Sequence, residues 1–166
     1  MGFTEMMNGN LPRKMRRDDC RMPLEAVEQY LRTETWGVLS VHGDNGFPYG
    51  VPMNYVWENG TVLLHATSEN SHRLDALERD NRVCFTVVPE HTLDRDRWTT
   101  VYRSIIVFGT AEIIRSPEEI FAAMRSFMGQ LAPHKTEEAF HSCDPKSAKM
   151  VMIRIRPVMV TGKQST

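Results

Sequence analysis

The chain has 166 residues, of which 41% are hydrophobic and 25% charged, a composition typical of a globular protein. This length predicts a single domain with a core of its own. Because 20 basic side chains oppose 21 acidic ones, the formal net charge is -1, and we expect neither nucleic acid nor an anionic membrane as a partner. No stretch approaches the roughly 20 apolar residues that a membrane-spanning helix needs.

The cysteines and histidines predict neither a disulfide framework nor a metal site. Cys20, Cys84 and Cys143 lie far apart and form no Cys-x-x-Cys pair. His134 and His141 precede Cys143, but their spacing matches no zinc motif, so we expect no metal. Reduced thiols, and an N-terminus without an apolar signal-peptide core, favour a cytoplasmic protein.

The first part of the chain predicts a polar arm, a helix and a strand. Residues 1–22 are polar, and we expect a mobile arm there. Pro23 suits the first turn of a helix that ends near Thr33. The apolar residues that share one face of this helix are Leu24, Val27, Tyr30 and Leu31. A strand at 36–42 and a hairpin loop at 43–46 follow.

The stretch 47–85 is the one around which the rest of the chain is organised. Its first part, 47–57, has the aromatic and β-branched residues of a strand, but two prolines and Gly50 interrupt it. Because proline cannot donate to a ladder, we expect an edge or bulged strand whose free backbone groups can meet a ligand. Asn59 and Gly60 predict a hairpin turn, after which 61–66 returns as the next strand.

Polar residues lead from this hairpin into a second helix. Hydroxyl, amide and basic groups fill residues 67–73, and an apolar helix face begins at Leu74. Asn70 or Ser71 is expected to cap the helix. Free N–H groups and the helix dipole, with Arg73 beside them, favour a phosphate there. A capped surface helix with an exposed arginine explains the same pattern without any ligand.

Three further strands complete the predicted sheet. The first, at 82–88, alternates apolar side chains on its two faces, and a charged loop at 89–99 follows it. The longest apolar run, at 101–114, is expected to be the central strand and to bend at a bulge near Gly109. Residues 150–155 form the closing strand.

A third helix precedes the closing strand, with Ser116 as its cap and Pro117 at its first position. Its predicted buried stripe consists of Ile120, Phe121, Met124, Phe127 and Met128. The strands show no regular alternation with helices, which argues against a Rossmann fold and for a mainly β protein. We divide the chain into the arm at 1–22, one domain at 23–160 and a tail at 161–166.

Five blocks of sequence carry a resemblance to a known family. They are residues 46–56, 63–66, 73–77, 82–85 and 102–111. In this order they resemble the pyridoxamine 5′-phosphate oxidase-like split-barrel flavoproteins, and most of all the branch that contains the 5-nitroimidazole resistance (Nim) proteins. The resemblance implies a six-stranded split β-barrel with added helices, which forms a homodimer and binds FMN across the dimer interface.

The resemblance also implies a set of cofactor-binding residues. The backbone that lies along the flavin ring is that of Val51, Pro52, Met53 and Asn54. The residues implied at the ring and ribityl edge are His65, Ala66 and Thr67, and those around the phosphate are Ser71, Arg73 and His72. This turn lacks the family's usual glycine, and its spacing from His65 to Arg73 is longer than is common.

Two further positions follow from the same resemblance. Tyr102 and Ser104 fall where the family's second subunit reaches the flavin, although cross-strand pairing alone explains them equally well. His65 matches the active-site histidine of Nim-type relatives, and an imidazole can donate a proton near neutral pH. A buried histidine bonded to backbone is the alternative for His65.

Three functional interpretations remain open at this point. The first is an FMN-dependent oxidoreductase acting on a small molecule, such as a nitroaromatic or a quinone, because flavin chemistry requires little from the protein beyond binding and electrostatics. The second is a flavin-binding protein without turnover, which serves storage, sensing or electron transfer. The third is a relative that holds a deazaflavin or haem in the same cleft. Pyridoxamine phosphate oxidase activity is not expected, because residues for that substrate's phosphate are not identifiable.

Overall fold

The structure is a computed structural model that describes residues 12–135, 137–138 and 149–165. Its strands are β1 (Trp36–His42), β2 (Pro48–Asn54), β3 (Val56–Glu58), β4 (Thr61–Thr67), β5 (Arg82–Asp94), β6 (Thr99–Ile114) and β7 (Met150–Ser165). Its α-helices are α1 (Leu24–Thr33), α2 (His72–Arg79) and α3 (Pro117–Leu131), and its 3-10 turns are η1 (Asp18–Cys20), η2 (Asp44–Gly46) and η3 (Pro133–Lys135).

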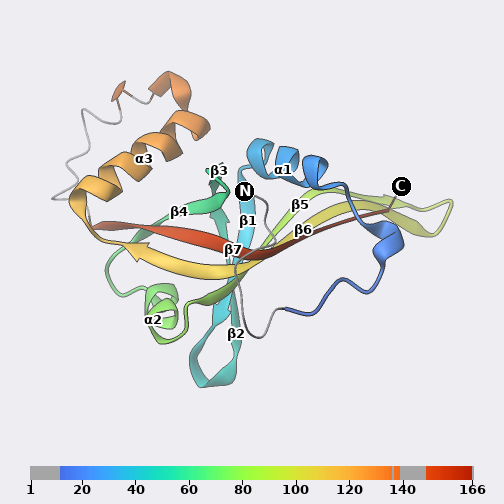
Figure 1. Ribbon diagram of the computed structural model, residues 1–166, viewed down its shortest axis with the longest axis horizontal. Helices are drawn as coiled ribbons and strands as arrows, with labels where there is room; N and C mark the ends of the chain where they lie inside the picture. Colours follow the sequence, from blue (N-terminus) through green and yellow to red (C-terminus); the bar gives the residue numbers. More distant parts are fainter. Residues whose placement is uncertain (1–11, 136, 139–148, 166) are drawn as a thin grey trace.

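The strands form one curled antiparallel sheet (Figure 1). Its order is β2-β1-β5-β6-β7-β4-β3, so β6 is central, as predicted. The sheet curls far enough for β2, at one edge, to contact β4, near the other, without a ladder between them. We call this unladdered meeting of β2 and β4 the seam. The predicted fold class, a mainly β split barrel, is confirmed.

The sheet has seven strands rather than the predicted six, because the expected strand at 47–57 breaks at Tyr55. The Tyr55 N–H donates to the carbonyl of Thr35 at 3.0 Å, and its side chain is fully buried. The chain crosses here from β2 at one edge of the sheet to β3 at the other. The prediction of an edge strand is thus confirmed, whereas the prediction of one continuous strand is wrong.

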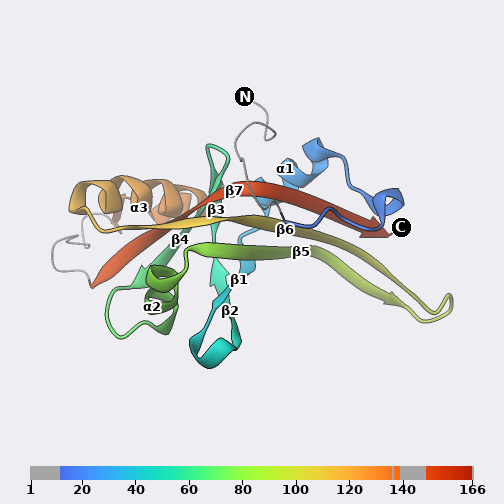
Figure 2. The same ribbon diagram turned by 60° about the horizontal axis from the view of Figure 1, so that its bottom comes forward.

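Two hydrophobic clusters occupy opposite faces of the sheet. The inner face carries the main core, which α1 and α2 close with Val27, Leu31, Leu74 and Leu77. The outer face of β3, β4, β6 and β7 is covered by α3. Helices α2 and α3 lie on opposite sides of the sheet (Figure 2). Strand β4 is therefore covered on both faces, which agrees with the continuous burial of residues 62–64.

Two predicted buried residues are exposed instead. Leu24 is 66% exposed, because α1 turns Val27 and Leu31 toward the core and its first turn overhangs the sheet. Phe121 is 38% exposed. The residues of α3 that are fully buried are Ile120, Ala123 and Phe127, and Phe121 lies about 100° further round the helix from Ile120.

The charged segment at 89–99 is not a loop. Strand β5 continues to Asp94, and β6 begins at Thr99. The Asp94 carboxylate accepts the N–H groups of Asp96 and Arg97 at 3.1 and 3.0 Å and so closes a tight turn. The polar sequence reflects a ribbon at the end of the sheet, in which residues 91–93 and 95–99 are exposed.

The closing strand is also longer than predicted. Strand β7 continues past Ile155 to Ser165 and pairs with the first half of β6, where Ser165 lies opposite Tyr102. Residues 161–165, which we expected to be a tail, are therefore part of the sheet. The predicted bulge at Gly109 is confirmed, because the register between β6 and β7 shifts there. A Cβ atom on Gly109 would collide with the carbonyl of Arg156.

Within the part of the chain that the structure describes, no helix is long and apolar enough to cross a bilayer. The same residues contain no cluster of three or more histidine, cysteine or acidic side chains that could hold a metal ion.

The hydroxyl group of Tyr55 gives a first testable expectation. It is buried and finds no hydrogen-bond partner within residues 12–135, 137–138 and 149–165, and burial raises the pKa of Tyr55. Because an unsatisfied buried hydroxyl destabilises the folded state, Tyr55→Phe should raise the free energy of unfolding by about 1 kcal/mol. Urea denaturation measures this, with Tyr30→Phe at a half-buried position as the control. A loss of stability in Tyr55→Phe would contradict the absence of a partner.

Candidate functional site

The candidate site lies at the seam, where the N-terminus of α2 reaches β2 and β4. An Nη atom of Arg73 lies 3.9 Å from the Met53 sulfur on β2. The charge of Arg73 also contributes to lowering the pKa of His65 on β4. Arg73 of α2 thus lies near both Met53 of β2 and His65 of β4, three residues that the sequence analysis named as candidates.

Arg73 stands out among the half-buried arginines because it has no carboxylate partner in the described parts of the chain. Arg103 pairs with Glu90, and Arg154 lies 3.8 Å from Glu112. In contrast, the Nε atom of Arg73 is buried and has no hydrogen-bond partner among the described residues. A buried guanidinium N–H is costly to leave unpaired, so this side chain is suited to receive an anion.

The N-terminus of α2 supplies further donors. Ser71 occupies the N-cap position, as expected, but its hydroxyl makes no capping hydrogen bond. Its carbonyl accepts the N–H groups of Leu74 and Asp75 at 2.8 and 3.1 Å. The backbone amides of His72 and Arg73 come before those of Leu74 and Asp75, at the positive end of the helix dipole. The Ser71 hydroxyl and these amides are therefore available to a phosphate.

The side chain of His72 is turned toward the first hairpin. Its ring stacks on Tyr49 at a centroid distance of 4.3 Å and an angle of 17°. Its Nε2 atom lies 3.3 Å from a carboxylate oxygen of Asp44, without hydrogen-bond geometry. Asp44 also pairs with Arg79 at 2.5 Å. These contacts tie α2 to the turn between β1 and β2 and hold the helix N-terminus at the seam.

His65 lies on the outer face of β4, the same face as Leu63, as the alternation predicted. Its side chain is exposed at the edge of α3, where the Phe127 ring meets it edge-on at a centroid distance of 5.3 Å. Partial burial, and secondly the charge of Arg73, lower the pKa of His65. The imidazole is therefore neutral at neutral pH. The alternative, a buried histidine bonded to backbone, is wrong.

The other predicted residues of β2 and β4 border the same seam. Val51 is half-buried, and Pro52 and Asn54 are exposed. Thr67 is exposed on the outer face, next to Met150 of β7. The side chain of Ala66 packs into the inner core, so only its backbone can take part in a site.

Tyr102 and Ser104 do not join this site within one chain. They pair with Ser165 and Lys163 near one end of β6, whereas the β7 partner of His65, Met152, pairs with Ile114 at the other end. The separation from residue 102 to residue 114 is 12 residues, or roughly 40 Å along the strand at about 3.3 Å per residue. Within one chain these two side chains therefore lie far from His65.

Sequence reasoning missed the residues that support the site. Phe127 was predicted as part of a buried stripe, and nothing in the sequence shows that α3 crosses β4 beside His65. Lys149 pairs with Glu69 at 2.9 Å, and its carbonyl accepts the Ser68 N–H at 3.0 Å, so the start of β7 holds the turn before α2. Because Lys149 is 80 residues from Glu69 in the sequence, no local pattern could predict these contacts.

The curled sheet, open along one seam and flanked by helices, defines the class of the protein as a split β-barrel. The family model of pyridoxamine 5′-phosphate oxidase matches residues 23–164. The chain therefore belongs to the pyridoxamine 5′-phosphate oxidase family, and the predicted family is confirmed. No curated protein matches the sequence.

Several solved structures share the fold. The conserved hypothetical protein Rv2991 from Mycobacterium tuberculosis is 24% identical, with a TM-score of 0.76 over 91% of this chain and 90% of that one. A proposed 5-nitroimidazole antibiotic resistance protein from Bacteroides thetaiotaomicron is 24% identical, with a TM-score of 0.69 over 84% and 82%. The flavocytochrome Anf3 from Azotobacter vinelandii is 20% identical, with a TM-score of 0.77 over 92% and 72%.

Proposed function

We propose that the protein binds FMN at the seam and acts as an FMN-dependent oxidoreductase on a small molecule such as a nitroaromatic or a quinone. The observation that carries the proposal is Arg73, whose buried Nε has no partner in the described ranges, where the other half-buried arginines are paired. The names of two similar structures, a flavocytochrome and a proposed 5-nitroimidazole resistance protein, support a flavin cofactor and this substrate class.

The residues present fit a phosphorylated flavin. Arg73, the Ser71 hydroxyl and the first amides of α2 would hold the phosphate, because all of them are donors next to a helix N-terminus. The free edge of β2 at residues 51–54 would bind the ring through backbone groups that no neighbouring strand uses. Thr67 and the backbone of Ala66 lie between these two regions.

The bound flavin would supply the electron transfer itself, as cofactors do in redox enzymes. His65 would supply a proton from its imidazole to a substrate at the outer face of β4. Partial burial, and secondly the charge of Arg73, keep the pKa of His65 low, so a proton taken up by the imidazole is readily given away. Phe127 contacts the imidazole edge-on and would help to orient it.

The experiment that tests the proposed function has two parts. The purified protein should bind added FMN and show the flavin absorption spectrum, and its reduced form should be reoxidised by menadione in the absence of oxygen. Binding of FMN without reoxidation would favour storage or sensing. A Soret band, or binding of a deazaflavin in preference to FMN, would overturn the choice of cofactor.

We also expect a homodimer, because Tyr102 and Ser104 reach a seam only in a second copy. On the same outer face of β6, Ile106 and Phe108 are half-buried apolar residues that a partner subunit would cover. Light scattering at low micromolar concentration should give the mass of two chains rather than 19.1 kDa. Phe108→Glu should give monomers that bind FMN weakly, and Glu112→Gln, an exposed control on the same strand, should not. A monomer that binds FMN tightly would contradict this expectation.

A further inference from the structure

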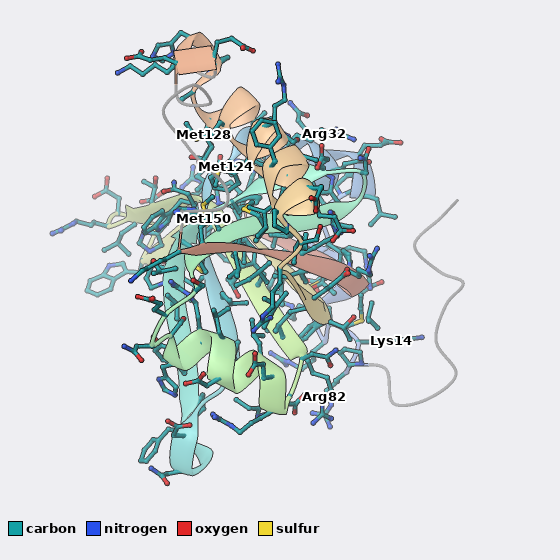
Figure 3. The ribbon with its side chains drawn as sticks, turned by 90° about the vertical axis from the view of Figure 1, so that its left-hand side faces the viewer. Lys14, Arg32, Arg82, Met124, Met128 and Met150 are labelled. Atoms are coloured by element: carbon teal, nitrogen blue, oxygen red, sulfur yellow. The ribbon has the colours of Figure 1, made fainter. Side chains whose placement is uncertain are left out.

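Three methionines come together on the outer face, next to His65. Met124 and Met128 lie on α3 and Met150 begins β7, and Figure 3 shows them where α3 passes over the start of that strand. All three are half-buried and pack against the cluster beneath α3. In contrast, Met152 and Met22 are 0% and 1% exposed. The three methionines are thus packed on this cluster but only partly enclosed.

Strand register and helix spacing place these three methionines on the same outer face as His65. Phe127 contacts His65, Met128 follows it directly, and Met124 lies one helical turn before it. On β7, Met150 is opposite Thr67 and therefore diagonal to His65, at a Cα separation of about 7–8 Å. We call Met124, Met128 and Met150 the methionine wall.

The charged groups beside this wall already have partners in the described parts of the chain. Lys149 pairs with Glu69 at 2.9 Å, and Glu58 accepts the Ser126 hydroxyl at 2.5 Å. Arg73, which has no carboxylate partner, faces the seam and is assigned to the phosphate in the proposed function. A ligand that bound against the methionine wall with a charged group would therefore lose the hydration of that group without gaining an ion-pair partner.

We infer that the methionine wall binds the substrate of the proposed reaction and selects an uncharged, flat aromatic molecule. This inference rests on the proposed function. Thioether side chains are flexible and polarisable, and they make favourable contacts with aromatic rings. Three such side chains can adapt to aromatic rings of different size, but they supply no hydrogen-bond donor or positive charge to a phosphate or sulfonate. The neutral imidazole of His65 would donate a hydrogen bond at the edge of such a ring.

The first test uses the full chain loaded with FMN and carrying carbon-13 in the methionine methyl groups. Titration with 1,4-naphthoquinone should shift the methyl resonances of the wall and leave that of Met22 in place. The anionic probe 1,4-naphthoquinone-2-sulfonate should bind at least about tenfold more weakly, because its charge is desolvated without a partner. Unmoved wall resonances, or equal binding of both probes, would overturn the inference.

The second test is kinetic and uses matched variants. The double variant Met124→Leu/Met128→Leu keeps the side-chain volume but stiffens the wall. We expect its KM for 1,4-naphthoquinone to rise about fivefold or more relative to that for 1,4-benzoquinone, because only the larger ring needs the wall to adapt. Its kcat should stay within about twofold, since His65 is unchanged. Met22→Leu is the control. Equal KM changes for both quinones would overturn the inference.

These results separate the inference from the proposed function. A protein that fails to bind FMN, judged from its absorption spectrum, would remove the proposed function whatever the methyl resonances do. A protein that binds FMN and reduces quinones, but whose wall resonances do not move, would overturn only the role of the methionine wall.

Discussion

Replacing Arg73 with alanine should weaken FMN binding by roughly tenfold to a hundredfold and leave riboflavin binding nearly unchanged, because a charge-assisted contact to phosphate contributes about 1.5–3 kcal/mol. Only FMN presents a phosphate to the unpaired guanidinium at the seam. Fluorescence titration of each flavin gives the two dissociation constants. Arg73→Lys should fall between the wild type and alanine, since an ammonium keeps the charge but loses the planar fork.

The matched control for this experiment is Arg82→Ala. Arg82 is an exposed arginine that is already paired with Asp80 at 2.5 Å, so its loss should change the affinity for neither flavin. If Arg73→Ala weakened FMN and riboflavin to the same extent, the side chain would support the fold of the seam and would not hold the phosphate.

Replacing His65 with alanine should lower the rate at which a quinone reoxidises the reduced flavoprotein by about a hundredfold, the usual effect of removing a positioned general acid. FMN binding should change little, because His65 lies beside Phe127 on the outer face and not at the α2 N-terminus. Rates are measured by anaerobic stopped flow and normalised to bound FMN. A variant that keeps the wild-type rate would remove His65 from the mechanism and favour a binding role without turnover.

The pH profile separates proton donation from a structural role of His65. Burial and Arg73 lower the pKa of His65 from its ordinary 6.5, so the imidazole gains its proton only below that value. The wild-type rate should therefore rise as the pH falls from about 8.5 to 5.5, without a plateau above about 6.5. The His65→Ala profile should be flat over the same range. Parallel profiles for the two proteins would assign the slope to another group.

Local patterns predicted those parts of the fold that depend on local chemistry. The strand Trp36–His42 was predicted with its observed bounds, because its alternation and the turn after it are both encoded nearby. The edge position of β2 followed from two prolines, which cannot donate to a ladder. Ser116 caps α3 by accepting the Glu119 N–H, as its position before Pro117 indicated.

Pairing between distant segments could not be predicted in the same way. Residues 89–94 and 161–165 are polar and carry little strand preference, and they become strands because each lies beside β6. The break at Tyr55 depends on the carbonyl of Thr35, which no local pattern identifies as its acceptor.

The residues of the candidate site likewise fall into those that local sequence predicted and those that depend on long-range packing. Arg73 and His65 were predicted from the residues and the family resemblance, and the structure brings both to one seam. Phe127 and the methionine wall depend on how α3 crosses β4 and β7, which involves long-range packing. The separation of Tyr102 from the seam likewise emerges only from the register of β6 and β7.

The prolines of β2 also affect how the protein behaves when it is concentrated. An edge strand with a full row of free N–H and C=O groups invites pairing with strands of other molecules, which leads to aggregation. Pro48 and Pro52 lie four residues apart, so their backbone nitrogens point to the same side of β2. This is the open side, away from the ladder with β1. They remove two N–H groups from the open edge. The seam can thus stay accessible to a small ligand while resisting intermolecular strand addition.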